Sequence, residues 1–320
     1  MQQPLVSVII PAFNVARYIE ETLASVCQQT YKNLEIIVIN DGSTDRTLSA
    51  LSRIIDSRLH VIDISNHGVS YARNLGINKA KGEIIAFLDG DDVWHERHIE
   101  TAVLFFERNP SVQWHVSSWR AATEIQNMNW SSEQNNDRIL NFFNNGHLKC
   151  WSSVVTIRKS AIFTEALFPV GISQGEDTIA WITIGNEHAQ LGYSPLITAM
   201  YRQRENSAVH SRKQLSEKLI ADESIFYHHI HQTKAFHRLS ASRSLRAWSL
   251  FSDSWHMLIQ NTSLTRLQQE VWRYSRNSGI IPSIYISIFI TLRAVLDAIF
   301  SFPLYLFSRV YKKLVSLSVK

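Results

Sequence analysis

Two aspartates separated by one glycine, Asp89 and Asp91, come directly after a run of apolar residues. In an extended segment residues i and i+2 point to the same side, and Gly90 lets the backbone turn between them. Two carboxylates that face one way suit Mg²⁺ or Mn²⁺, with water and phosphate oxygens as the remaining ligands. Asp and Gly are also common in solvated turns. The tripeptide alone therefore leaves a metal site and a plain turn both open.

The elements that must position this tripeptide alternate along residues 1–120. Short β-branched runs predict strands, and apolar residues at helical spacing between them predict helices. The expected strands cover residues 6–10, 34–39, 59–64 and 84–88. The expected helices carry Ile19, Leu23 and Val26, then Leu48, Leu51 and Ile55, then Val69, Ala72 and Leu75.

These strand runs are almost continuously apolar, which is typical of strands that helices cover on both faces. The alternation of strands and helices therefore predicts an α/β doubly wound domain. In such sheets ligands bind beyond the carboxyl ends of the strands. Two of those ends carry acidic loops, at residues 41–45 and 89–92.

The chain is less regular after residue 92. Trp94 onward is expected to be helical, which would make Asp92 a residue of the helix start. Strands are expected at 112–119 and 154–157, a loop at 127–138 and a short helix at 159–163. A further helix should begin at Glu176, because Ile179 and Ile182 follow on one side.

Composition excludes several classes of protein. Hydrophobic residues make up 45% and charged residues 19%, which is ordinary for a folded domain and excludes a wholly disordered chain. The two cysteines are too few for a cysteine-rich zinc site and give little support for a disulfide scaffold, so a reducing compartment is expected.

The charge is divided unequally along the chain. Residues 1–200 carry 15 basic and 21 acidic side chains, a net charge of −6, whereas residues 201–320 carry 17 basic and 7 acidic ones, a net charge of +10. A basic half can face nucleic acid or anionic lipid. No helix-turn-helix, zinc-finger or RNA-binding motif accompanies it, so we expect no nucleic-acid partner.

The C-terminal residues 280–310 are too apolar for an ordinary exposed tail, and Lys312 and Lys313 follow them. No run of about 18 uncharged apolar residues occurs, so a clear transmembrane helix is not expected. The segment fits a helix or hairpin in the interface of an anionic membrane, at its cytoplasmic face. A helical pair docked on the protein itself, or a dimer interface, is the alternative.

Four segments in series resemble the family 2 inverting glycosyltransferases with a GT-A fold. They are VSVIIPAFN at 6–14, INDGSTD at 39–45, GVSYARN at 68–74 and KGEIIAFLDGDD at 81–92. The resemblance is strong over about residues 4–105 and weaker to about 210. It implies a GT-A-like, doubly wound mixed sheet in a catalytic domain at 1–210. A helical basic region at 211–278 and the apolar segment at 279–320 would follow as a mostly helical extension.

The resemblance also implies residues that bind a nucleotide-sugar donor. Backbone groups of Pro11, Ala12 and Asn14 would face the base. Asp41 would contact the base or the ribose, with the shaping of an Asp-Gly turn as its alternative. Arg73 would neutralise the diphosphate or orient the metal-site carboxylates, with a plain surface arginine as its alternative.

For the metal, the resemblance implies that Asp91 coordinates a divalent cation, Mn²⁺ or Mg²⁺. Asp89 would contact the ribose and belong to the same metal motif. Asp92 would lie behind these two ligands if it does not start a helix.

Residues 168–177 resemble the Glu-Asp motif of this family, whose second acid is generally the catalytic base. Asp177 would then accept the proton of the acceptor hydroxyl, and Glu176 would support it. Alternatively, both acids only favour the positive end of the helix that begins there.

The implied reaction is an inverting transfer of a sugar from a nucleoside diphosphate to a hydroxyl of a glycan or lipid-linked acceptor. We expect the nucleoside diphosphate to be UDP. Such enzymes build cell-surface polysaccharides and glycans. The Gln-x-x-Arg-Trp motif of processive members does not occur, so a single addition is expected. A nucleotide-sugar-binding protein without transferase activity and a nucleotidyltransferase are the alternatives. A nucleotidyltransferase needs a basic Gly-rich loop near the N-terminus, which residues 11–14 do not supply.

Overall fold

The structure is a computed structural model that describes residues 3–130, 136–142, 150–171 and 176–203. The predicted basic region at 211–278 and apolar segment at 279–320 lie outside the described residues. Within the described ranges, no helix is long and apolar enough to cross a bilayer.

One mixed sheet of nine strands forms the centre of the described domain, with the order β3-β2-β1-β4-β8-β6-β9-β5 and with β7 paired to β9. The first half is parallel, because β1 pairs in parallel with β2 and β4, and β2 with β3. Strand β8 runs antiparallel to both β4 and β6. The strands are β1 (Val6–Ala12), β2 (Leu34–Asp41), β3 (Leu59–Ile64), β4 (Ile84–Phe87), β5 (Val93–Trp94), β6 (Trp114–Ala122), β7 (Arg138–Asn141), β8 (Val155–Arg158) and β9 (Gln190–Arg202).

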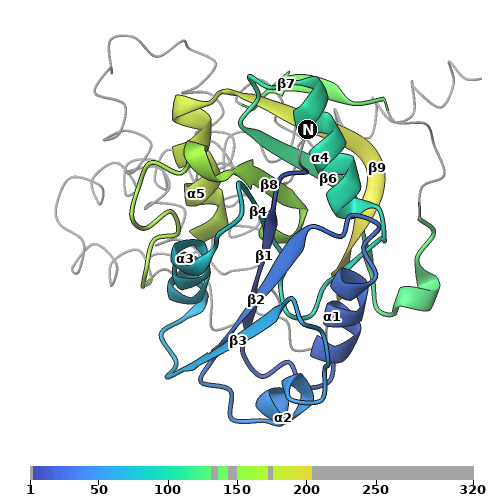
Figure 1. Cartoon of the computed structure of the whole chain (residues 1–320), viewed down its shortest axis with the longest axis vertical. Helices are drawn as coiled ribbons and strands as arrows, with labels where there is room; N and C mark the ends of the chain where they lie inside the picture. The colour runs from blue at the N-terminus through green and yellow to red at the C-terminus, as the bar shows by residue number, and fades with distance from the viewer. Residues whose placement is uncertain (1–2, 131–135, 143–149, 172–175, 204–320) are drawn as a thin grey trace, which may run out of the picture. The chain divides into compact units, whose positions relative to one another are not determined.

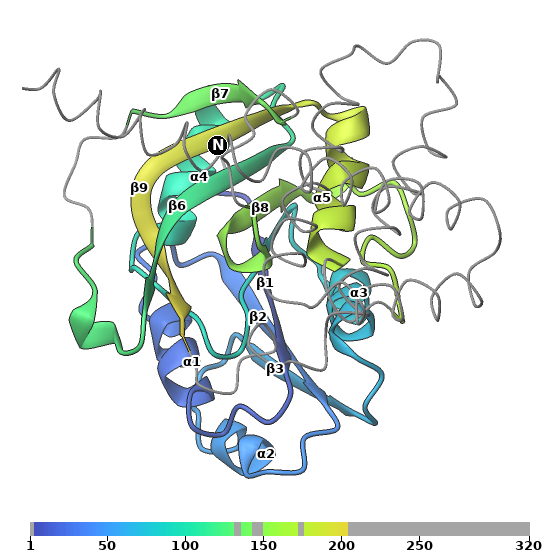
Figure 2. The same cartoon turned by 180° about the vertical axis from the view of Figure 1, so that it is seen from behind.

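Helices cover both sides of this sheet, so the predicted doubly wound α/β arrangement with a mixed sheet is confirmed. Figures 1 and 2 show α1 and α4 on one side and α3 and α5 on the other. The α-helices are α1 (Ile19–Cys27), α2 (Thr47–Leu51), α3 (Val69–Lys79), α4 (His98–Arg108) and α5 (Glu176–Glu187). Short 3₁₀ helices are η1 (Ile125–Asn127), η3 (Ser152–Val154) and η4 (Lys159–Ala161).

Burial explains why the sequence pattern identified the inner strands. Every residue of β1, β2 and β4 is buried, as expected for strands between two helical layers. Strand β3 lies at the edge of the sheet and is partly exposed, which fits its interspersed His60 and Asp63.

The helix expected from Trp94 onward is wrong. Val93 and Trp94 form the short strand β5, which pairs with Met200 and Ala199, and α4 begins only at His98. The Trp94 indole Nε1 donates to the backbone oxygen of Ser153 at 2.7 Å, a tertiary contact that a local pattern cannot reveal.

Three smaller expectations also needed correction. The second helix ends at Leu51, and Ile55, which was expected within that helix, lies beyond its end and is fully exposed. The helix expected at 159–163 is the 3₁₀ turn Lys159–Ala161. The strand expected at 112–119 begins at Trp114 and continues to Ala122.

Two histidines, His98 of α4 and His115 of β6, lie fully inside the domain. His98 Nδ1 lies 2.9 Å from Thr198 Oγ1, and His115 Nε2 lies 2.8 Å from Ser194 Oγ. Burial lowers the pKa of each imidazole to about 3, and the nearby His115 contributes to the lowering at His98. Both rings are therefore neutral at physiological pH.

This burial predicts acid lability. The unfolded state binds more protons than the folded state between about pH 6.5 and pH 3, so stability falls as pH drops below about 6.5. The slope is at most about 1.4 kcal/mol per pH unit for each histidine. Urea unfolding at pH 7 and at pH 5 measures the loss of stability between these two pH values. The double variant His98→Gln/His115→Gln should lose less stability between these two pH values than the wild type, and an equal loss would contradict this origin.

Candidate functional site

The acidic loop at residues 89–92 follows β4 at the carboxyl edge of the parallel strands. A hydrogen bond from Asp92 N to Asp89 O at 3.0 Å closes the turn. Thr22 of α1 donates to Gly90 O at 3.1 Å. A Cβ at Gly90 would lie 3.0 Å from Pro11 O and 3.6 Å from Ala12 Cα, so a larger residue would require the end of β1 to move by a few tenths of an ångström.

Asp92 is the buried anchor of this loop, so of its two expected places, a helix start or a position behind the metal ligands, the helix start is wrong. Its Oδ2 accepts from Ser153 Oγ at 2.6 Å, and its Oδ1 accepts from the backbone N–H of Arg202 at 3.0 Å. Burial, and then the charges of Asp91 and Asp89, raise the pKa of Asp92 well above its ordinary value. The local sequence carried no signal for these partners, which lie 61 and 110 positions away.

Arg73 joins two of the other predicted site residues in a buried ion cluster. Its Nη2 donates to Asp89 Oδ1 at 2.6 Å and its Nη1 donates to Glu176 Oε1 at 2.8 Å. The Arg73 side chain is only 4% exposed, so the alternative of a plain surface arginine is wrong. Burial acts to lower the pKa of Arg73, but the two carboxylates outweigh it and raise that pKa above its ordinary value.

Helix α3 also holds the segment that leads to Glu176. Asn74, next to Arg73, accepts from Phe168 N at 3.0 Å and donates to Phe168 O at 2.7 Å. The Arg73 guanidinium lies 5.1 Å from the centroid of the Phe168 ring. Neighbouring residues of one helix therefore contact both the carboxylate of Glu176 and the backbone of Phe168.

Asp177 is half-buried in the first turn of α5, beside Glu176. Its Oδ1 accepts from the backbone N–H of Thr178 at 2.6 Å. Burial, and then the charge of Glu176, raise the pKa of Asp177 to about 7, although Arg73 opposes the shift. A carboxyl group with this pKa exchanges a proton near neutral pH, as a general base requires.

The loop after β1 is tied to the loop after β2 through Asn14, which has a positive φ of 52°. Asn14 Oδ1 accepts from the backbone N–H of Thr44 at 2.8 Å, and Asn14 N donates to Ser43 Oγ at 3.0 Å. Pro11 and Ala12 are buried within β1, whereas Phe13 exposes 47% of its surface. Of the residues predicted to face a base, Asn14 thus also ties the two loops together.

Asp41 holds the start of α3. Its Oδ1 accepts from His67 N at 2.7 Å and its Oδ2 accepts from Gly68 N at 2.8 Å. Gly68 has a φ of 90°, which a glycine adopts readily. The carboxylate of Asp41 thus fixes the backbone at residues 67 and 68, directly before α3.

The described residues contain no group of three or more His, Cys, Asp or Glu side chains arranged around a metal position. Asp89 and Asp91 supply two carboxylates, and Mg²⁺ commonly takes one or two carboxylates and completes its coordination with water and substrate phosphates. The charges of Asp91 and Asp89 already disfavour ionisation of Asp92. This excess of negative charge fits a divalent cation that the substrate helps to hold.

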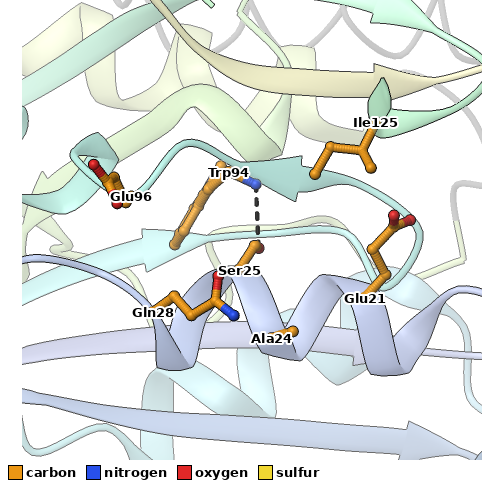
Figure 3. Close-up of a pocket in the computed structure, with 7 residues that line it drawn as sticks. All are labelled: Glu21, Ala24, Ser25, Gln28, Trp94, Glu96 and Ile125. Carbon is orange, nitrogen blue, oxygen red and sulfur yellow. Dashed lines mark hydrogen bonds between the residues drawn. The ribbon is translucent and has the colours of Figure 1, made fainter. Parts of the chain in front are cut away.

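A cavity of about 230 Å³ opens beside α1, and none of the residues predicted to bind the donor or the metal or to act as the base lines it. Figure 3 shows side chains of α1 facing Trp94 and Ile125, with Ser25 Oγ accepting from Trp94 N. Its lining residues are Glu21, Ala24, Ser25, Gln28, Trp94, Glu96 and Ile125.

Known proteins resemble the chain over the part that carries this site. The family model "Glycosyl transferase family 2" matches residues 7–168. An uncharacterized glycosyltransferase of Rickettsia bellii (strain RML369-C) is 34% identical over 223 residues, which are 67% of this chain and 31% of the relative. The chain thus spans about a third of the length of that relative. A Bacillus subtilis (strain 168) protein described as a candidate teichuronic acid biosynthesis glycosyltransferase, TuaG, is 42% identical over 106 residues, covering 32% of this chain and 42% of the relative.

Solved structures share the fold. The mannosyltransferase PcManGT from Pyrobaculum calidifontis, in complex with GDP-Man and Mn²⁺, has a TM-score of 0.61 at 19% identity and covers 93% of this chain and 81% of its own. S. aureus TarS 1-349 in complex with UDP-GlcNAc has a TM-score of 0.57 at 18% identity and covers 78% of this chain and 80% of its own. The GT-A type of sheet is thereby confirmed. Because the family model matches half of the chain, this protein belongs to glycosyl transferase family 2.

Proposed function

We propose that this chain transfers a sugar from a nucleoside diphosphate, UDP in the first instance, to a hydroxyl group of an acceptor. The observation that carries the proposal is the cluster of Arg73, Asp89 and Glu176 with Asp177 beside it, at the carboxyl edge of the parallel strands. The UDP-GlcNAc complex of TarS and the GDP-Man complex of PcManGT support the class of donor.

In the proposed step, the acceptor oxygen forms a bond to the anomeric carbon while the bond to the β-phosphate oxygen breaks. The nucleoside diphosphate leaves with the electron pair, and the proton of the acceptor hydroxyl passes to Asp177. One displacement inverts the configuration at the anomeric carbon. Arg73 fixes Asp89 and Glu176 around the place of reaction, and its positive charge favours the departing diphosphate.

Asp91 and Asp89 would hold a divalent cation, Mn²⁺ or Mg²⁺. When bound, such a cation neutralises the negative charge that develops on the leaving diphosphate. Asp89 Oδ1 accepts a hydrogen bond from Arg73. We therefore assign the direct contact with the cation to Asp91, and the contact with the ribose to Asp89.

For the acceptor, we propose a glycan or a lipid-linked sugar in the synthesis of a cell-surface polysaccharide. The description of the Bacillus subtilis relative as a teichuronic acid biosynthesis protein supports this class. The apolar sequence at 280–310 and the lysines that follow it fit an enzyme that meets such an acceptor at the cytoplasmic face of an anionic membrane. The absence of the Gln-x-x-Arg-Trp motif favours a single addition.

Donor binding should depend on the metal, because the acidic loop repels a polyanion unless a cation offsets its charge. We expect UDP to raise the melting temperature in Mn²⁺ or Mg²⁺ and to have little effect in EDTA. In Asp91→Asn, Mn²⁺ or Mg²⁺ should no longer increase the effect of UDP on the melting temperature. Glu100→Gln, which alters the ion pair between Glu100 of α4 and the exposed Arg97 just before that helix, is the matched control and should keep this dependence. Equal stabilisation of the wild type by UDP in Mn²⁺ and in EDTA would refute the coupling.

A further inference from the structure

Arg202 is the last residue of β9 and is only 2% exposed. It lies outside residues 7–168, on which the family assignment depends. We propose that Arg202 is a positioning residue, which fixes the backbone of Asp91 and thereby the carboxylate that would bind the metal. This inference rests on the proposed function, because it assigns a role in the same reaction.

The contacts of Arg202 join the acidic loop to two other parts of the domain. On the loop side, its Nε donates to Asp91 O at 2.8 Å, and its backbone N–H donates to Asp92 Oδ1 at 3.0 Å. On the other side, its Nη1 donates to Thr123 O at 3.2 Å, and its Nη2 donates to the carboxylate of Glu21 on α1.

These bonds require an arginine. The planar guanidinium presents five N–H donors in a fixed fork, so one side chain reaches Asp91, Thr123 and Glu21 at the same time. Its carbon Cζ also lies 5.0 Å from the centroid of the Tyr18 ring. A lysine in this place would keep the charge but lose the simultaneous contacts.

The backbone of the acidic loop is then held at residues 89, 90 and 91. Ser153 Oγ accepts from Asp89 N at 3.1 Å, Thr22 holds Gly90 O, and Arg202 holds Asp91 O. Arg202 is thus the described contact that pins the main chain of the proposed metal ligand. Partners that orient a metal ligand typically change metal affinity or activity about 10- to 100-fold when they are replaced.

The test compares Arg202→Lys with Arg158→Lys. Arg158 is a suitable control, because it also donates to two backbone oxygens, those of Val112 at 3.1 Å and Phe106 at 3.0 Å, and has no contact with the acidic loop among its described partners. Release of nucleoside diphosphate is titrated with Mn²⁺. The UDP-induced rise in melting temperature is titrated with Mn²⁺ in parallel.

In Arg202→Lys we expect the Mn²⁺ concentration at half effect to rise about 10- to 100-fold in both titrations. Arg158→Lys should keep the wild-type value even if its melting temperature falls. If the wild type itself shows no effect of Mn²⁺ and no nucleotide binding, the proposed function fails and this inference fails with it. If the wild type needs Mn²⁺ and Arg202→Lys needs no more of it, the inference about Arg202 alone is overturned.

A second variant covers the case in which Arg202→Lys does not fold. Glu21→Gln removes the charged anchor of Nη2 and leaves Arg202 itself in place. Glu21→Gln should also raise the Mn²⁺ concentration at half effect, but by a smaller factor than Arg202→Lys. If Arg202→Lys does not fold and Glu21→Gln needs the same Mn²⁺ concentration as the wild type, Arg202 only stabilises the fold and the inference is overturned.

Discussion

Asp177→Asn is expected to lower sugar transfer by about 10²- to 10⁴-fold while UDP binding is retained. The asparagine keeps the size of the side chain and the oxygen that accepts from Thr178 N, but it cannot take a proton from the acceptor hydroxyl. Steady-state rates with saturating donor, together with the UDP-induced shift in melting temperature, separate the loss of chemistry from a loss of binding.

Glu176→Gln is the matched variant, because it changes the neighbouring acid of the same helical turn. It should weaken the pair with Arg73 and lower the rate less than Asp177→Asn does. A dead Glu176→Gln together with an active Asp177→Asn would show that the base is assigned to the wrong acid.

The free energy of unfolding of Asp177→Asn, compared with that of the wild type at several pH values, should report the pKa of Asp177. With a pKa of about 7 in the folded protein, the wild type binds more protons folded than unfolded between about pH 4 and pH 7, so this carboxyl lowers stability as pH rises through that window. Asp177→Asn should therefore be more stable relative to the wild type at pH 8 than at pH 4. The wild-type transfer rate should fall as pH drops below about 7, because the protonated carboxyl is no base.

Arg73→Met is expected to destabilise the domain by about 3–5 kcal/mol, the usual cost when one partner of a buried ion pair is removed. The carboxylates of Asp89 and Glu176 would lose their shared cation in a site where water screens charge poorly. Urea unfolding at pH 7 measures the effect. Adding Glu176→Gln to Arg73→Met should restore part of the stability, because one uncompensated charge is then gone.

The control for Arg73 is an exposed ion pair of the same chemistry. Arg53 pairs with Glu20, and their side chains are 65% and 52% exposed, so Arg53→Met should cost no more than about 1 kcal/mol. Similar losses of stability in Arg53→Met and Arg73→Met would mean that the buried cluster does not have the energetic role given to it here.

The sequence allowed good predictions where local patterns determine structure. Strands β1 to β4 were located because they are apolar runs bounded by turn residues, and Glu176 is the first described residue of α5, as expected. Strands β5, β7 and β9 were missed. β9 carries polar residues such as Ser194 and Thr198, which pair with buried groups of other elements and hide the strand pattern.

Within the candidate site, single residues were predictable and their partnerships were not. The motifs indicated Arg73, Asp89 and Glu176, but Arg73 and Glu176 are 103 positions apart, and only the fold shows that they form one ion cluster. Asp92 was expected either at a helix start or behind the two acids, and its partners Ser153 and Arg202 could not be predicted because they are brought to it only by the fold. No role was predicted for Arg202, because its contacts with the acidic loop are tertiary hydrogen bonds.

The most direct test of the central claim is a transfer assay on the full chain with a panel of nucleotide sugars, scored by released nucleoside diphosphate with and without glycan and lipid-linked acceptors in Mn²⁺. We expect at least one donor, a UDP-sugar first among them, to release its nucleoside diphosphate faster with an acceptor than without one. That acceptor-dependent release should be lost in Asp177→Asn. Acceptor-dependent release that is as fast in Asp177→Asn as in the wild type, or no release from any donor that the protein binds, would contradict it.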